Sequence, residues 1–162
     1  MLKRWLLLST CLLLTACGFQ LRDAYQIPPP MQQLALDYPQ FSAFGEALAQ
    51  RLELAGVVID PASDTRIEVL SDQLDRRTLS LSASGQVAEY ELIYQVQYQL
   101  RQRDGTPQVF QLEVFRDYQD DPNFALAKSR EREILVQEMR VEAARRALLQ
   151  LINELTETPS QP

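Results

Sequence analysis

The chain contains no histidine, and this absence removes several classes of functional site at once. Histidine is the commonest general base in enzymes and the commonest zinc ligand. The hydroxyls of Ser80, Ser82 and Ser84 therefore have no imidazole to activate them, and no Gly-x-Ser-x-Gly motif is present. A serine–lysine pair would have to use Lys128, the only lysine beyond residue 16. Phosphate-binding glycine loops and metal-ligand spacings are also missing, so we expect a protein that is not an enzyme and carries no cofactor or metal.

Cysteine is scarce as well, and both cysteines lie within the first seventeen residues. Lys3 and Arg4 form a basic start that precedes a short apolar run at 5–14. A transmembrane helix needs about 20 apolar residues, so this run indicates a cleaved signal segment instead. The ending Leu14-Thr15-Ala16-Cys17 resembles the lipobox of bacterial lipoproteins, in which the cysteine is lipidated and the residues before it are removed.

The resulting domain prediction has four parts. Residues 1–16 form the signal peptide, and 17–30 form a lipidated tether that starts at Cys17. The three prolines at 28–30 favour an extended, polyproline-like end of that tether. Residues 31–155 form one domain, and 156–162 form a flexible tail because they lack core-forming side chains.

Positive charge is in deficit too. The formal net charge of the whole chain is −6. Without Lys3 and Arg4 it becomes −8, because 14 basic residues face 22 acidic ones. No basic run or stripe compensates for this deficit, so we expect no nucleic-acid partner. An anionic ligand would need a local basic cluster within about 8–10 Å, the range over which charges act in physiological salt.

The stretch 85–100 has the clearest structural pattern in the chain. From Tyr90 to Leu100 every even position is apolar, and Ile93 is the only apolar residue among the odd positions between them. Successive side chains of a strand point to opposite faces, so this pattern predicts a long strand with one buried and one polar face. Another part of the chain must cover the buried face. The Glu/Gln face is left for water or a polar partner.

Other stretches show the periods of strands or helices. We expect strands at 31–38, 57–60, 66–81 (with weak alternation beyond 71) and 109–118, the last preceded by an Asp104-Gly105 turn. A helix is expected at 39–55, with Phe41, Phe44, Leu48, Leu52 and Ala55 on its apolar side. A second helix should run from about 123 to 155, because Ala127, Ile134, Val141, Leu148 and Leu155 recur every seven residues. The predicted fold class is α+β: a two-layer sandwich of an about four-stranded sheet with two helices packed on one face.

Basic residues cluster locally despite the negative total. Arg76 and Arg77 lie in the expected third strand, and Lys128, Arg130 and Arg132 lie in the first turns of the last helix. Cations are favoured at helix C-termini, so their position near an N-terminus suggests an anionic ligand. Pairing with Glu131, Glu133 and the aspartates at 120 and 121 is the competing explanation.

A series of short motifs resembles one known family. In chain order they are the lipobox, Cys17-Gly18-Phe19-Gln20-Leu21-Arg22, Gly85-Gln86-x-Ala88-Glu89-Tyr90, Arg116-x-Tyr118 with Asp120-Asp121-Pro122, Leu126-Ala127-Lys128, and Glu138-Met139-Arg140. Together they are similar to the LptE family of LPS-assembly lipoproteins in Gram-negative outer membranes. The resemblance covers nearly the whole chain after the signal peptide.

The resemblance implies a partner, a ligand and a location. LptE-like proteins have a two-layer α/β fold and form a plug-and-barrel complex with the β-barrel LptD. They support its assembly, and the complex delivers lipopolysaccharide to the outer leaflet. The family is also thought to bind lipopolysaccharide, which makes Lys128, in the Leu-Ala-Lys motif, the first candidate contact. Gly18 after the cysteine, rather than aspartate, implies the outer membrane, with the protein on its periplasmic side and inside the barrel lumen.

The resemblance also shows one departure. Some relatives carry a basic residue just before the Gly-Gln pair, where this chain has Ala83-Ser84. Arg76 or Arg77 are the candidates to replace it, and Arg130 completes the set of candidate lipopolysaccharide contacts.

Two other functions remain as alternatives. The first is a free outer-membrane lipoprotein that binds peptidoglycan or another periplasmic protein. The second is a lipid-anchored hydrolase, which the absence of histidine disfavours.

Overall fold

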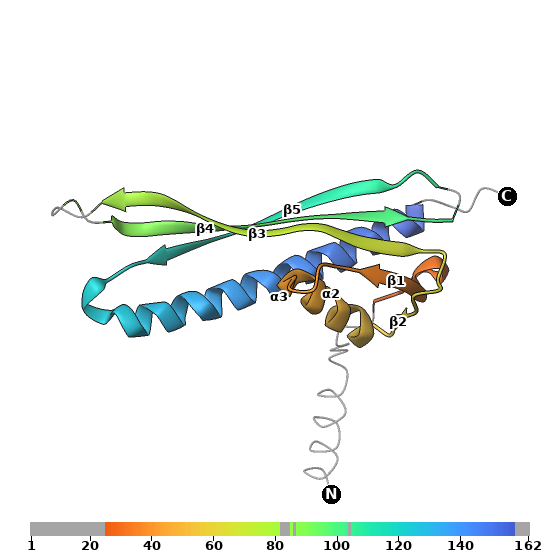
Figure 1. Ribbon diagram of the computed structural model, residues 1–162, viewed down its shortest axis with the longest axis horizontal. Coiled ribbons are helices and arrows are strands. Elements are labelled where there is room, and N and C mark those ends of the chain that lie inside the picture. Colours follow the sequence, from red (N-terminus) through yellow and green to blue (C-terminus); the bar gives the residue numbers. More distant parts are fainter. Residues whose placement is uncertain (1–24, 82–84, 86, 104, 158–162) are drawn as a thin grey trace, which may run out of the picture.

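The computed structural model describes residues 25–81, 85, 87–103 and 105–157 (Figure 1). In chain order its elements are η1 (Pro29–Met31), β1 (Gln33–Asp37), α2 (Ala43–Leu54), β2 (Val58–Ile59), β3 (Arg66–Leu81), β4 (Val87–Arg101), β5 (Gln108–Gln119), η2 (Pro122–Phe124) and α3 (Ala125–Glu157). The predicted signal peptide, Cys17, the Ala83-Ser84 position and residues 158–162 lie outside the described residues.

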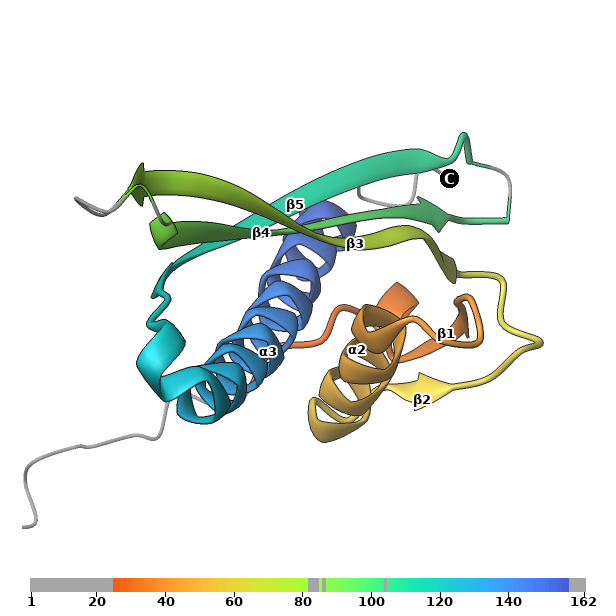
Figure 2. The same cartoon turned by 60° about the vertical axis from the view of Figure 1, so that its left-hand side comes forward.

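The strands form one sheet in the order β2-β1-β3-β4-β5. β1 pairs in parallel with β2 and with β3, whereas β3, β4 and β5 form antiparallel pairs. Both helices lie below this sheet in Figure 1 and again in Figure 2. The predicted α+β two-layer sandwich is therefore confirmed, and the sheet has five strands because the two-residue β2 adds to its edge.

The alternating stretch forms β4, and its two faces are as predicted. Leu92, Tyr94, Val96, Tyr98 and Leu100 are each at most 3% exposed and pack against the helices. The opposite face carries polar side chains that pair across strands. The Gln95 amide, for example, donates to Glu113 Oε1 at 2.8 Å. No described segment of the chain covers that outer face (Figure 2).

β3 is a single strand of 16 residues, although its sequence alternates poorly. The register with β4 shifts between Val69 and Ser71, where an extra residue enters the strand. Such a bulge moves the apolar positions to the other parity. Ile67 and Val69 face the helices before it, and Leu74, opposite Tyr94, faces them after it. The weak alternation thus reflects an irregular strand and not a break between two strands.

The first helix begins later than its apolar pattern predicts. Ser42 is the N-cap of α2, and its hydroxyl accepts a hydrogen bond from the Gly45 backbone N–H at 3.0 Å. Phe41 therefore precedes the helix and is 88% exposed, so its assignment to the apolar stripe was wrong. Phe44, Leu48 and Leu52 are fully buried, as predicted.

Asp72 connects β3 to the start of α2. Its carboxylate accepts hydrogen bonds from the Ser42 hydroxyl at 2.9 Å and the Phe44 backbone N–H at 2.8 Å. A third bond comes from the Tyr94 hydroxyl, whose pKa is raised by burial and by the bond to Asp72. A carboxylate at the positive end of a helix stabilises that helix, so one side chain fixes α2 against the sheet.

The buried stripe of α3 differs from the heptad in the sequence. Leu148 and Leu155 are buried as expected, but Ile134 is 61% and Val141 is 49% exposed, and Ala127 is exposed as well. The residues buried toward the N-terminus are instead Val136 and Met139. The buried stripe runs through residues that are four apart, Met139, Ala143, Ala147, Leu151 and Leu155, so it winds around the helix where a seven-residue repeat stays nearly straight.

The proline-rich segment before β1 is partly helical rather than wholly extended. Pro29–Met31 form one 3-10 turn, in which the Met31 N–H donates to the Pro28 carbonyl at 2.9 Å. Proline is tolerated here because the first residues of a helix have no intrahelical N–H partner to lose. Tyr25 and Ile27 pack against the core, so residues 25–30 belong to the folded unit.

Candidate functional site

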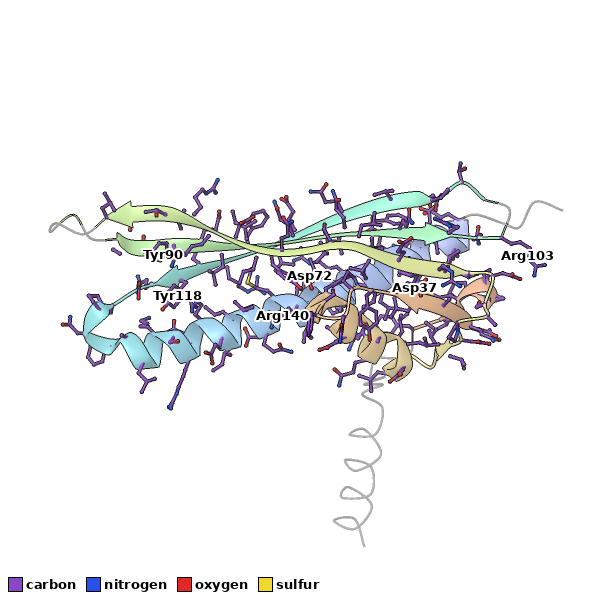
Figure 3. The ribbon with its side chains drawn as sticks, viewed as in Figure 1. Asp37, Asp72, Tyr90, Arg103, Tyr118 and Arg140 are labelled. Atoms are coloured by element: carbon purple, nitrogen blue, oxygen red, sulfur yellow. The ribbon has the colours of Figure 1, made fainter. Side chains whose placement is uncertain are left out.

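The four candidate basic residues lie on two elements at the same end of the molecule. Lys128 and Arg130 are in the first turns of α3, and Arg76 and Arg77 are in the distal half of β3. This end also carries Tyr90 and Tyr118, which Figure 3 places close together between the strands and α3. The structure does not gather the four basic side chains into one site.

Arg76 and Arg77 point to opposite faces of the sheet because they are neighbours in a strand. Arg77 forms an ion pair with Glu91 at 2.6 Å on the outer face. Arg76 stands opposite Leu92 and so shares the helix-facing side. Its guanidinium lies 4.4 Å from the centre of the Tyr90 ring, a cation–π contact that holds the charge in place.

Lys128 lies beside Tyr118 and Glu131. Its ammonium group is 2.9 Å from Glu131 Oε2 and 5.6 Å from the centre of the Tyr118 ring. The Tyr118 hydroxyl donates to the Lys128 carbonyl at 2.9 Å, which fixes the start of α3 against β5. The hydrogen bond to Glu131 raises the pKa of Lys128, so the side chain remains positively charged. Arg130 is exposed and forms no ion pair with any residue that the structure describes.

A hollow of about 410 Å³ surrounds Lys128. It is lined by Leu79, Glu89, Asp117, Tyr118, Gln119, Lys128 and Glu131. The pKa of Glu89 is lowered by hydrogen bonds from Ser80 and Gln119, so its carboxylate stays charged. Lys128 is therefore one cation among three carboxylates, and an anion here must displace Glu131.

A second hollow, of about 660 Å³, lies between β3, β4 and α3. Its lining includes Arg76 together with Arg132 and Arg140, and it shares no residue with the hollow at Lys128. Arg140 was not among the candidate ligand residues. The signal that could have found it is its spacing from Arg132 and Val136, since residues four apart share a helix face.

The described ranges contain neither a membrane-spanning helix nor a metal-binding cluster. No helix among the described residues is both long and apolar enough to cross a bilayer. In the same ranges, no group of histidine, cysteine, aspartate or glutamate side chains has the arrangement of a metal site.

Comparison with known proteins identifies the family. The family model LptE, described as lipopolysaccharide-assembly, matches residues 31–151. The chain belongs to the LptE family. This range contains all of the candidate basic residues, so Lys128, Arg130, Arg76 and Arg77 lie in the part of the chain that the LptE family shares.

Individual relatives agree with this assignment. The chain is 35% identical over 153 residues to the LPS-assembly lipoprotein LptE of Yersinia enterocolitica, which covers 91% of this chain and 74% of that relative. It is 36% identical over 152 residues to the protein of the same name from Photorhabdus laumondii, covering 91% and 84% of the two chains.

Two solved structures share the fold. The rare lipoprotein B of Shewanella oneidensis superposes with a TM-score of 0.71 at 42% identity, over 77% of this chain and 97% of that one. A lipoprotein B of Nitrosomonas europaea also gives a TM-score of 0.71, at 25% identity, over 86% and 93% of the two chains. The sandwich of one sheet and two helices is thus a fold that this chain shares with these two lipoproteins.

Proposed function

We propose that this LptE-family lipoprotein is a non-catalytic subunit of the lipopolysaccharide transport machinery that plugs a β-barrel of the LptD type. Family membership over residues 31–151 is the observation that carries the role in lipopolysaccharide transport. LptE is not known as a family of enzymes. The proposal adds three finer statements: the anchor is the lipid on Cys17, the partner is the barrel, and lipopolysaccharide is bound directly.

The uncovered outer face of the sheet supports docking inside a barrel. Its polar side chains already pair with one another, as in the Arg77–Glu91 ion pair at 2.6 Å and the Ser80–Glu89 hydrogen bond at 2.8 Å. A face of this kind can lie against another polar surface without leaving buried hydrogen-bond donors or acceptors without partners. The interior of large outer-membrane barrels is polar, so it matches the polar part of this face. Ile93 and Phe115, which pair opposite each other, form a small apolar area on the same face.

Co-purification tests the barrel partner. A tagged, lipidated protein should come out of detergent extracts together with a large β-barrel protein, and Gln95→Arg or Gln97→Arg should weaken that association. Gln50→Arg is the matched control, because it makes the same change at an exposed position of α2, in the helix layer and away from the outer face of the sheet. Recovery without any barrel protein would instead favour a free lipoprotein that binds peptidoglycan or another periplasmic protein.

Lys128 is the proposed contact for a lipopolysaccharide phosphate. Its ion pair with Glu131 is solvent-exposed, and exposed pairs contribute only about 0–1 kcal/mol, so a phosphate can replace the carboxylate. A charge-assisted bond to phosphate contributes about 1.5–3 kcal/mol. Replacement is therefore favourable once the phosphate is held nearby by the rest of the lipid.

The variant Lys128→Asp tests this contact. We expect it to weaken lipopolysaccharide binding by about tenfold or more, and to leave the barrel complex intact. Arg103→Asp makes the same charge change at the opposite end, beside Asp64, and should leave binding unchanged. Equal binding by Lys128→Asp and the unmodified protein would remove the assigned role.

The anchor is tested separately. Cys17→Ser should abolish the incorporation of labelled palmitate and release the protein from membranes, because three acyl chains at about 0.8 kcal/mol per buried methylene provide the attachment. Continued incorporation in the variant would place the lipid on another residue.

A further inference from the structure

The hollow between β3, β4 and α3 has the composition of a binding site that the Lys128 proposal does not use, and of its lining only Arg76 is among the candidate lipopolysaccharide contacts. Its volume is about 660 Å³, and its lining is Leu74, Asp75, Arg76, Leu92, Arg132, Glu133, Val136, Gln137 and Arg140. It lies where the strands extend beyond α2, so only α3 faces the sheet there (Figures 1 and 2).

Three arginines reach this hollow from its two walls. Arg132, Val136 and Arg140 are spaced by four residues, which puts them on one face of α3 with the valine between the two arginines. Arg76 comes from the opposite wall, because it stands opposite Leu92 on the helix-facing side of β3.

The three arginines are not held in ion pairs in the part of the chain that the structure describes. The lining contains two acids, Asp75 and Glu133, so three guanidinium groups are accompanied by two carboxylates. Asp75 stands opposite Ile93 in the register of β3 and β4, so its side chain leaves the strand on the side away from α3.

Arg140 adds evidence for an absent partner. Its Nε atom is buried, and no described residue accepts a hydrogen bond from it. A buried donor without an acceptor costs about 1–3 kcal/mol, and more for a charged group. Arg140 is also beside Tyr94, where its positive charge opposes the rise in the pKa of that phenol. Arg140 therefore lines the hollow beside the core residue Tyr94, and Figure 3 shows it near Asp72.

The walls between the arginines are apolar. Leu92 and Val136 are nearly buried, at 2% and 8% exposed, and the apolar surface open to water is mainly that of Leu74, which is 42% exposed although it faces the helix side. A small inorganic anion would leave the Leu74 surface in water. An anion attached to an apolar chain would cover it, at about 25 cal/mol per Å² of apolar surface removed from water.

We propose that this hollow binds a phosphate monoester carried on an apolar chain, with Arg76, Arg132 and Arg140 as its phosphate ligands. The planar guanidinium fork matches phosphate oxygens in bidentate geometry, which a lysine does not. The site is separate from Lys128, so it stands or falls independently of the proposed lipopolysaccharide contact there.

A titration of isotope-labelled protein by NMR tests the site. The protein is the full mature chain with Cys17→Ser, so that its own acyl chains do not compete for the hollow. The probes are monodecyl phosphate below its micelle concentration, inorganic phosphate, and decyl maltoside as an uncharged amphiphile. We expect monodecyl phosphate to shift the backbone amides of Arg76, Leu92 and residues 132–140, and to bind at least about tenfold more tightly than either other probe.

Variants then separate the arginines from general surface charge. Arg76→Gln and Arg132→Gln should each weaken monodecyl phosphate binding by about tenfold. Arg145→Gln on the same helix, outside the hollow and paired with Glu142, should leave it unchanged. An unperturbed spectrum elsewhere in the chain shows that each variant is folded.

Several results would overturn the proposal. If inorganic phosphate binds as tightly as monodecyl phosphate, the hollow does not recognise the apolar chain. If decyl maltoside binds as tightly as monodecyl phosphate, the hollow does not recognise the phosphate. Shifts confined to the surroundings of Lys128, or none at all in the chain with only Cys17→Ser, would remove the site.

Discussion

The two ends of this molecule use the same sheet in different ways. At the packed end, defined by α2, β1, β2 and residues 139–155 of α3, large apolar side chains such as Leu48 and Leu148 are fully buried. At the open end, defined by η2, residues 125–137 of α3 and the strand segments above them, Leu126 is 70% and Leu81 is 63% exposed. Stability is therefore concentrated at one end, and surface available to partners at the other.

The lengths of the two helices cause this difference. α2 has 12 residues and α3 has 33, so at 1.5 Å per residue they are about 18 Å and about 50 Å long. Neighbouring strands are about 4.8 Å apart, and a helix with its side chains is about 10 Å wide. Two helices cover the sheet at the packed end. One helix alone leaves part of it uncovered at the open end, where both hollows with basic residues lie.

The largest expected effect is at the packed end. Leu148 is fully buried, and Leu148→Ala should lower the free energy of unfolding by about 2–5 kcal/mol, because it leaves a cavity in the core. Urea unfolding followed by circular dichroism measures this loss. The control is Val141→Ala on the same helix, where the side chain is 49% exposed and a change within about 0.5 kcal/mol is expected. Equal losses in the two variants would contradict the assignment of Leu148 to the buried face of α3 and of Val141 to its exposed face at the packed end.

The next effect is at the boundary between the two ends. Asp72→Ala removes the acceptor for Ser42, for the Phe44 backbone N–H and for Tyr94. We expect a loss of about 1–3 kcal/mol in the free energy of unfolding, since these donors become unsatisfied. Asp75→Ala is the control, because Asp75 is an exposed residue of the same strand. If the two variants unfold at the same urea concentration, Asp72 does not fasten α2 to the sheet.

A smaller effect depends on pH. Hydrogen bonds from Arg145 and Arg146 lower the pKa of Glu142 from its ordinary value of 4.5 to about 2. Because the folded pKa is below the unfolded one, the pairing stabilises the protein above pH 4.5 and is lost as pH falls toward about 2. Exposed pairs contribute at most about 1 kcal/mol, so the effect is modest and should shrink in high salt.

The variant Glu142→Gln isolates this contribution. Its melting temperature should be lower than that of the unmodified protein at neutral pH, and the two should converge as pH approaches the folded pKa. A difference that persists at the acid end would mean that Glu142 acts through packing and not through charge.

The smallest expected effect is at the open end. Ile134 belongs to the heptad pattern but is 61% exposed, so Ile134→Ala should change the free energy of unfolding by no more than about 0.5 kcal/mol. Met139→Ala, from the fully buried side of the same helix, should cost about 2–5 kcal/mol in the same urea experiment. A loss for Ile134→Ala close to that of Met139→Ala would show that the open end is packed after all.

The sequence predicted the sheet better than it predicted the helix faces. β4 has its apolar and polar residues on the expected sides because a strand repeats every two residues and β4 is regular from Glu89 to Arg101. The heptad of α3 failed at Ile134 and Val141 because the buried residues of this helix are spaced by four, so the buried stripe winds away from a seven-residue repeat.

The candidate site was predicted only in part. Lys128 was found through the Leu-Ala-Lys motif, and the structure shows which groups contact it. The association of Arg76 with Arg132 and Arg140 could not be predicted from sequence. It depends on the bulge after Val69, which decides the side of the sheet that Arg76 faces, and on the packing of α3 across β3 and β4.

By itself, the sequence determined which segments are strands and helices, the two faces of β4, the family motifs and the absence of histidine chemistry. These depend on local backbone geometry and on residue identity. Only the tertiary structure decided which residues of α3 are buried, which end of the sheet is left open, and which arginines share a hollow. Those outcomes depend on the relative lengths of the two helices and on which side of the sheet each β3 residue faces after the bulge. They also depend on the long-range contacts that bring distant segments together.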